Sequence, residues 1–418
     1  MNLERDLRPY DVLIVGAGHA GAQTAIGLRK AGFSGSISII GDEPDPPYER
    51  PPLSKDYLGG DKGFERILIR PESFWAENEV SLHLGMTVES VDPVAHTVLA
   101  RDGSVLGYGR LVWAAGGKAR RLSCEGANLA GVHVVRSRAD VDLLLRDLKT
   151  ADSVVVVGGG FIGLETAATI RKSGKAVTVV EAQPRLLARV AGPEISDFFA
   201  EEHRNQGVRI LLGTAIQRLE AIDGRVSAVV LTDEERLPAD VVIVGIGIIP
   251  SSEPLVMAGA RGGNGIWVDG SGRTSLSDIF AVGDCALHGS GIAQGAEIRL
   301  ESVQNAADMA GVVVKTLMGE TASYDAVPWF WSNQYELKLQ TVGLASGYDE
   351  TVVRGHPSEG GFSVIYLRAG QVIALDCVNA VRDYVQGRAL VASQMCVSRD
   401  LLADVSIPLK SHAITQGG

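Results

Sequence analysis

The chain has 418 residues, a length that usually divides into roughly two or three domains, and its 45% hydrophobic and 21% charged residues exclude a disordered protein. The net charge of -11 disfavours binding to the phosphates of nucleic acids. No apolar run reaches the roughly 18 residues of a membrane span, and the charged N-terminus lacks a signal segment, so a cytoplasmic location is expected.

The first part of the chain predicts a unit that binds a dinucleotide. Residues 11–15 form a continuous apolar run, which is typical of a parallel strand buried on both faces. A G-x-G-x-x-G loop follows at residues 16–21, and residues 22–31 have a helical pattern. Residues 36–40 indicate a second strand, after which comes an acid, Asp42.

Each position of this loop has a mechanical reason. Gly16 permits a sharp turn, Gly18 lets a pyrophosphate approach the backbone, and Gly21 lets the helix pack closely on the strand. The helix N-terminus offers free N–H groups to the phosphates, and Asp42 can accept hydrogen bonds from ribose. The alternative is that the glycines serve only a tight turn.

The same pattern recurs after a domain-sized interval. Residues 153–157 predict a strand, residues 158–163 repeat the G-x-G-x-x-G loop, and residues 164–173 predict a helix. Another strand is expected at residues 177–180, with Glu181 as the acid at its end. Two such units in one chain favour a flavin enzyme that binds FAD in one unit and a nicotinamide coenzyme in the other.

Glu181 bears on which nicotinamide coenzyme is used. Its carboxylate would repel the 2′-phosphate of NADP and accept hydrogen bonds from the two free hydroxyls of NAD, so NADH is favoured. Arg185 argues in the other direction, because an arginine can accommodate that phosphate.

A later segment, residues 274–286, indicates an apolar strand that ends at Gly283 and Asp284. Asp284 could bind a sugar-like polyol there, although such an acid is more often a helix cap. The cysteines Cys124, Cys285, Cys377 and Cys396 form no C-x-x-C pair, which excludes a local redox dithiol and a zinc knuckle. The histidines show no metal-ligand spacing, so no metal site is predicted.

Together these segments resemble the FAD-dependent pyridine-nucleotide oxidoreductases. Further motifs resemble the oxygenase-coupled ferredoxin reductases within that family, and the resemblance runs over essentially the whole chain. The motifs are YERPPLSK at 48–55, GGGFIGLE at 158–165, GIGIIP at 245–250, ESVQNA at 301–306, PWFWS at 328–332 and VSIPLK at 405–410.

The resemblance implies an α/β fold with two Rossmann-like dinucleotide-binding domains and a small C-terminal α+β domain. It implies an FAD domain from residues 1–117 and 245–325, an NAD domain from 118–244 and a C-terminal interface domain from 326–418. The implied FAD-binding residues are Gly16, Gly18, Ala20, Gly21, Asp42, Arg50, Lys55, Val88, Arg136, Asp284 and Val303, and those along NAD are Gly158, Gly160, Ile162, Gly163, Glu165, Glu181 and Gly247.

The resemblance also implies an activity, in which NADH passes a hydride to FAD and single electrons leave to a two-iron two-sulfur ferredoxin that serves an oxygenase. Lys55 would pair with Glu165 near the flavin and stabilise the charge of its reduced form. The alternative is a surface lysine and a glutamate on a helix face. Trp331 would lie over the flavin edge, toward the docked ferredoxin, or would simply pack in the C-terminal domain.

Competing functions remain open on the sequence alone. A rubredoxin reductase would use the same chemistry with another iron protein. A peroxidase or disulfide reductase is disfavoured, because the loop at Lys55 has no cysteine. A flavin-bearing signalling protein, resembling apoptosis-inducing factor, would use redox state to control association.

Overall fold

The computed structural model describes residues 9–414, and its contacts divide the chain into two compact units. Unit 1 contains the described part of Met1–Arg50, with Gly63–Lys118 and Ile248–Pro328. Unit 2 contains Pro51–Lys62, Ala119–Gly247 and Trp329–Gly418, again as far as the chain is described. Within residues 9–414 no helix is both long enough and apolar enough to cross a bilayer.

Unit 1 is built on a sheet whose strands run in the order β3-β2-β1-β6-β5-β4, with β19 also paired to β6. The strands β1, β2, β3, β6 and β19 pair in parallel, whereas β4 and β5 join through antiparallel pairing. Their bounds are β1 (Tyr10–Val15), β2 (Ile37–Ile40), β3 (Val80–His83), β4 (Val88–Asp92), β5 (Thr97–Ala100), β6 (Val105–Trp113) and β19 (Ile279–Ala281).

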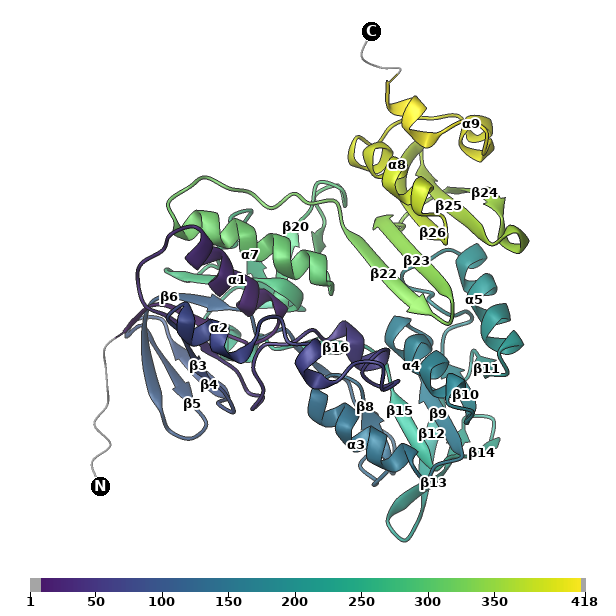
Figure 1. The fold of residues 1–418 in the computed structure, drawn as a ribbon, viewed down its shortest axis with the longest axis horizontal. Coiled ribbons are helices and arrows are strands. Elements are labelled where there is room, and N and C mark those ends of the chain that lie inside the picture. Colours follow the sequence, from purple (N-terminus) through teal and green to yellow (C-terminus); the bar gives the residue numbers. More distant parts are fainter. Residues whose placement is uncertain (1–8, 415–418) are drawn as a thin grey trace. The chain divides into compact units, whose positions relative to one another are not determined.

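Helices cover this sheet, and Figure 1 shows α1 and α7 side by side. The apolar run of β1 is fully buried, as expected for a parallel strand with both faces covered. The helices are α1 (His19–Lys30), α2 (Glu72–Glu77), α6 (Glu253–Met257) and α7 (Val303–Leu317). The smaller strands are β7 (Gly117–Ala119), β16 (Ile248–Pro250), β17 (Gly262–Gly263), β18 (Gly265–Val268), β20 (Ala286–Gly289) and β21 (Glu297–Ile298).

Unit 2 contains a second parallel sheet, with strands in the order β11-β10-β9-β15-β8. Its elements are β8 (Val132–Val134), β9 (Ser153–Val157), β10 (Ala176–Glu181), β11 (Arg209–Leu212), β15 (Val241–Val244), α3 (Arg138–Leu148), α4 (Phe161–Lys172) and α5 (Pro193–Asn205). A three-stranded antiparallel sheet accompanies it, made of β12 (Ile216–Ile222), β13 (Arg225–Leu231) and β14 (Arg236–Pro238).

The C-terminal part of unit 2 is an antiparallel sheet in the order β22-β23-β26-β25-β24, with α8 packed on it (Figure 1). Its elements are β22 (Trp329–Gln334), β23 (Leu337–Gly343), β24 (Glu350–His356), β25 (Gly361–Arg368), β26 (Gln371–Val378), α8 (Val381–Ala392) and α9 (Arg399–Ala403). The short 3-10 turns of the molecule are η1 (Pro51–Ser54), η2 (Phe64–Arg66), η3 (Gly283–Cys285), η4 (Pro357–Glu359) and η5 (Leu409–Ile414).

The predicted fold class is confirmed. The chain contains two strand–loop–helix motifs of the dinucleotide-binding type and, in addition, an antiparallel C-terminal sheet. The helices after the two loops begin earlier than predicted, at His19 and Phe161, because Gly18 and Gly160 already act as their N-caps. The division into three domains stays a prediction. Unit 2 holds both the segment assigned to NAD and the C-terminal segment, and it includes Pro51–Lys62.

Candidate functional site

The first glycine loop is shaped so that only its middle glycine faces open space. Gly16 has a φ of +118°, and a Cβ there would lie 2.2 Å from the carbonyl oxygen of Ala114. A Cβ on Gly21 would lie 1.9 Å from the carbonyl oxygen of Gly16. Gly18 would meet nothing within 4 Å, and no side chain caps the helix N-terminus that it begins. This arrangement fits a pyrophosphate held on backbone N–H groups.

Charged residues of unit 1 gather around this loop. Burial lowers the pKa of His19, with a raising effect from the charge of Asp284 and a lowering effect from that of Arg50. A Cβ on Gly283 would lie 3.0 Å from the Cβ of Ala20, so the turn that carries Asp284 lies against the start of α1. The structure therefore brings together the glycine loop, Arg50 and Asp284, which were predicted to contact FAD.

The other predicted FAD residues of unit 1 occupy the starts or ends of elements. Asp42 is exposed just after β2, Val88 begins β4 and Val303 begins α7. Arg50 forms an ion pair with Glu43 at 2.5 Å. The sequence pattern had pointed to the neighbouring acid, Asp42, and not to Glu43. Two further predicted FAD residues, Lys55 and Arg136, belong to unit 2.

The second glycine loop repeats the geometry of the first. Gly158 has a φ of +107°, and a Cβ there would lie 2.4 Å from the carbonyl oxygen of Gly245. A Cβ on Gly163 would lie 2.1 Å from the carbonyl oxygen of Gly158, whereas Gly160 would meet nothing within 4 Å. The N-terminus of α4 is likewise not capped by a side chain. Unit 2 thus holds a second cradle of the same kind.

Polar side chains border this second cradle. Glu181, at the end of β10, accepts hydrogen bonds from the backbone N–H of Gly159 at 2.6 Å and of Gln183 at 2.7 Å. Ile162 is 43% exposed on the first turn of α4, and Gly247 has a φ of +91° in the loop after β15. The predicted NAD residues therefore lie around the loop at the carboxyl edge of the parallel sheet.

Arg185, the residue that argued for NADP, is held by other groups. Its guanidinium donates to the carbonyl of Ala191 at 2.6 Å, to Ser196 Oγ at 2.7 Å and to the carbonyl of Ala188 at 3.0 Å. These bonds fix the local loop.

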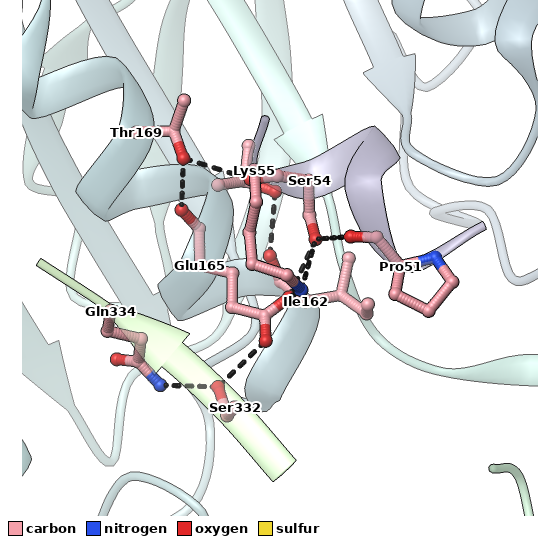
Figure 2. A network of polar contacts seen from close by, with 9 residues as sticks. Pro51, Ser54, Lys55, Ile162, Glu165, Thr169, Ser332 and Gln334 are labelled. Atoms are coloured by element: carbon pink, nitrogen blue, oxygen red, sulfur yellow. Dashed lines mark hydrogen bonds and ion pairs between the residues drawn. The ribbon is translucent and has the colours of Figure 1, made fainter. Parts of the chain in front are cut away.

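The predicted Lys55–Glu165 pair is present within unit 2, as Figure 2 shows. Lys55 Nζ lies 2.6 Å from Glu165 Oε2, and Ser54 Oγ donates to the same oxygen at 2.6 Å. Thr169, one turn further along α4, donates to the backbone carbonyl of Ser54 at 3.0 Å and so ties η1 to the helix. Glu165 is 2% exposed, so its charge is balanced inside the protein.

The other oxygen of Glu165 belongs to a longer network that the sequence reasoning missed. Ser332 Oγ donates to Glu165 Oε1 at 2.7 Å, and Gln334 Nε2 donates to Ser332 Oγ at 3.1 Å. His203 Nε2 lies 2.8 Å from Gln334 Oε1. Ser332, Gln334 and His203 are all buried. The available signals were Ser332 and Gln334, which lie two residues apart and so share one face of the strand, and a histidine in register with the buried stripe of α5.

Trp331 lies on the other face of β22 from Ser332, because side chains alternate along a strand. It is half-buried and contacts Trp329, with ring centroids 5.6 Å apart. Phe330, on the Ser332 face, packs on Phe161 at the start of α4. The role predicted for Trp331 toward the flavin stays a prediction.

The cysteines of the described chain are all free thiols. Burial raises the pKa of Cys285 to about 12, and its Sγ–H donates to the carbonyl of Val282 at 3.3 Å. Burial likewise raises the pKa of Cys377 to about 12. Thiols held protonated in this way are poor nucleophiles. Within residues 9–414 no three His, Cys, Asp or Glu residues are arranged to hold a metal ion.

Comparison with known proteins gives the following matches. The family model described as pyridine nucleotide-disulphide oxidoreductase matches residues 10–310, and a model described as reductase C-terminal matches residues 329–413. A ferredoxin–NAD(P)+ reductase of a Sphingomonas species is 58% identical over 96% of this chain and 97% of its own length. The ferredoxin reductase subunit of a 5,5′-dehydrodivanillate O-demethylase from a Sphingobium strain is 54% identical, over 98% of this chain and 99% of its own length.

Among solved structures, the covalent complex of putidaredoxin reductase with putidaredoxin contains a chain similar to this one. The TM-score is 0.94 at 38% identity, and the match covers 98% of this chain and 99% of that chain.

Proposed function

This chain belongs to the pyridine nucleotide-disulphide oxidoreductase family, and from that premise we propose that it is an NAD(P)H-dependent ferredoxin reductase of an oxygenase system. The single observation that carries the proposal is the identity of 58% and 54%, over nearly the whole chain, to ferredoxin reductases. The intact glycine cradles in both units support it, because an enzyme of this kind needs two dinucleotide sites.

The family implies FAD and NAD(P)H as the redox partners, and the residues present fit both. We assign FAD to the cradle of unit 1, where the charges of Arg50 and Asp284 act on His19 at the start of α1. We assign the nicotinamide coenzyme to the cradle of unit 2. Bound FAD would supply the chemistry that no side chain can, which is acceptance of a hydride and release of single electrons.

The side chains divide the remaining tasks. Gly18 and Gly160 leave room for phosphates at the N-termini of α1 and α4. Glu181 favours NADH, and the tethered guanidinium of Arg185 supports that preference. The ammonium group of Lys55 is oriented by Glu165 and Ser54, and we propose that it favours FAD in its reduced state.

An exit of electrons through sulfur finds no support. Cys285, which follows the predicted flavin contact Asp284, is buried and held as a thiol. The partner is therefore a one-electron carrier, and the relative solved in complex with putidaredoxin is consistent with a ferredoxin. That this ferredoxin carries a two-iron two-sulfur cluster, and that the enzyme works in the cytoplasm, are proposals.

The test is anaerobic reduction of purified carriers. The purified protein should be yellow and should reduce a two-iron two-sulfur ferredoxin with NADH faster than with NADPH. A rubredoxin, assayed in parallel, should be reduced more slowly. Two results would contradict the proposal: loss of activity on alkylation of the exposed thiol Cys396, which would indicate a sulfur exit, or slow turnover with every carrier together with dimerisation on NADH, which would indicate a signalling protein.

A further inference from the structure

The buried network that begins at Glu165 does not end at its ion pair. It continues through Ser332 and Gln334 on β22 to His203 on α5, and Tyr335 Oη lies 3.3 Å from His203 Nδ1. These residues are far apart in the sequence, yet all of them belong to unit 2. Figure 2 shows Ser332 and Gln334 on the strand that faces Glu165. The ion pair alone does not require such a chain.

The donor and the acceptor of each hydrogen bond in this network follow from the chemistry of the side chains. The ionised carboxylate of Glu165 can only accept, so the single hydroxyl hydrogen of Ser332 points to Glu165 Oε1. The oxygen of Ser332 is then left to accept, and the amide nitrogen of Gln334 must be its donor.

The same logic reaches the histidine. With its nitrogen turned to Ser332, Gln334 presents Oε1 to His203, so Nε2 of His203 carries the hydrogen. Burial lowers the pKa of His203, so the ring is neutral and Nδ1 is an acceptor for Tyr335 Oη. Every donor therefore points toward Glu165, and the dipoles add along the chain.

We propose that Ser332, Gln334 and His203 are positioning residues for the Lys55–Glu165 pair. They hold one carboxylate oxygen of Glu165 in a fixed direction, which leaves the other oxygen to orient Lys55 Nζ together with Ser54. In this proposal, the position of the ammonium charge depends on side chains of β22 and α5 as well as on Ser54. The effect of this positioning on FAD rests on the proposed function.

The chain offers matched variants. Ser332→Ala removes the donor to Glu165, and Ser332→Thr keeps the hydroxyl. Gln334→Glu has nearly the same shape as glutamine, and in its ionised form it can only accept, so it then draws the hydrogen of Ser332 away from Glu165. Asn333→Ala is the control, because Asn333 is exposed on the opposite face of the same strand.

The first readout needs no redox activity. Amine modification of Lys55 is followed by mass spectrometry in the holoprotein, with the exposed Lys315 of the same sample as the reference. The side chain of Lys55 is only 15% exposed in the pair. We expect its modification to be severalfold faster in Ser332→Ala and Gln334→Glu, and unchanged in Ser332→Thr and Asn333→Ala.

The second readout is the midpoint potential of bound FAD. We expect Ser332→Ala and Gln334→Glu to lower the ratio of reduced to oxidised FAD about tenfold at a fixed potential, a shift of about 30 mV for two electrons. The control variants should keep the potential of the wild type. A purely structural role would lower the unfolding temperature without this shift.

The outcomes separate the two proposals. If Ser332→Ala and Gln334→Glu match the wild type in both Lys55 modification and potential, the positioning role is wrong, whatever the ferredoxin activity. If the wild type binds no FAD, the proposed function fails, and Lys55 modification still decides the positioning role. Should Ser332→Ala not fold, Gln334→Glu decides in its place.

Discussion

Glu181 holds the second glycine loop in place, and its position bears on the coenzyme that we propose for this loop. Its two oxygens accept from the N–H groups of Gly159 and Gln183, which places the negative charge beside the second glycine loop. A second phosphate on the coenzyme ribose would approach that charge, whereas two hydroxyls could donate to it. We therefore expect the carboxylate to act as a filter against NADPH.

Replacement of Glu181 by glutamine should weaken this filter. We expect kcat/KM for NADPH relative to NADH to rise about tenfold, which is about 1.4 kcal/mol. Steady-state kinetics with both coenzymes measure it, and Glu201→Gln, at an exposed site on α5, is the matched control. An unchanged ratio would show that the charge of Glu181 does not select the coenzyme.

The roles of single residues could be predicted only where the residues belong to a recognisable motif. The Lys55–Glu165 pair came from the resemblance to a family, because 110 residues separate the two and no local pattern links them. The resemblance gave no role to Ser332, Gln334 or His203. Their partners are set by the packing of β22 against α4 and α5, which a strand pattern does not reveal.

Elements were predicted most reliably where glycine geometry and apolar runs coincide. The strand at Ser153–Val157 has the predicted bounds, since a buried parallel strand is a continuous apolar run. The helices after the loops were placed too late, because a glycine N-cap carries no side-chain signal. The strands of the C-terminal sheet depend on antiparallel partners whose register no single segment contains.

The glycines of the second loop should respond differently to alanine. Gly160→Ala meets no atom within 4 Å, so the fold should tolerate it while the methyl group occupies the space for the pyrophosphate, and we expect a higher KM for NADH. Gly163→Ala brings Cβ to 2.1 Å from a backbone oxygen, and we expect a loss of stability of about 3 kcal/mol. Kinetics and thermal unfolding measure the two effects. An unchanged KM for NADH in Gly160→Ala would show that the second glycine loop does not bind the coenzyme.

For the whole molecule, the distribution of the chain over two units could be foreseen only in outline. The two repeated patterns indicate two nucleotide-binding parts, yet the segment Pro51–Lys62 belongs to unit 2 although its neighbours on both sides belong to unit 1. Contacts such as that of Ser54 with Glu165, 111 residues away, decide this assignment. A local sequence pattern does not reveal contacts between residues that lie so far apart in the chain.

One buried carboxyl group, Asp376, makes the folded protein more stable at low pH than at high pH. Burial raises the pKa of Asp376 to about 7, so the folded state keeps a proton that the unfolded chain loses above about 4. This contribution to stability is present at low pH and is lost as the pH rises through about 7. Buried His203 and His288, whose pKa values are lowered, act oppositely, because the unfolded chain takes up protons below about 6.5.

Asp376→Asn should remove the first term and leave the second. The asparagine still accepts the hydrogen bond of Tyr366 Oη, so we expect the unfolding temperature of the variant relative to the wild type to rise between pH 5 and pH 8. Thermal unfolding at both pH values measures this difference, and Asp197→Asn, at an exposed site, should show none. A difference independent of pH would mean that Asp376 is charged in the folded protein.

The near-identity of the two glycine loops has a consequence for selectivity. Gly18 and Gly160 open onto equivalent space, and the flanking glycines meet equivalent backbone oxygens, so neither loop alone distinguishes one adenine dinucleotide from the other. For the proposed coenzymes, we expect discrimination from the neighbouring residues, with Arg50 and Asp284 beside one loop and Glu181 beside the other. A fragment such as ADP, which both proposed coenzymes share, is therefore expected to compete at both loops, and a binding titration with ADP against each coenzyme would measure it.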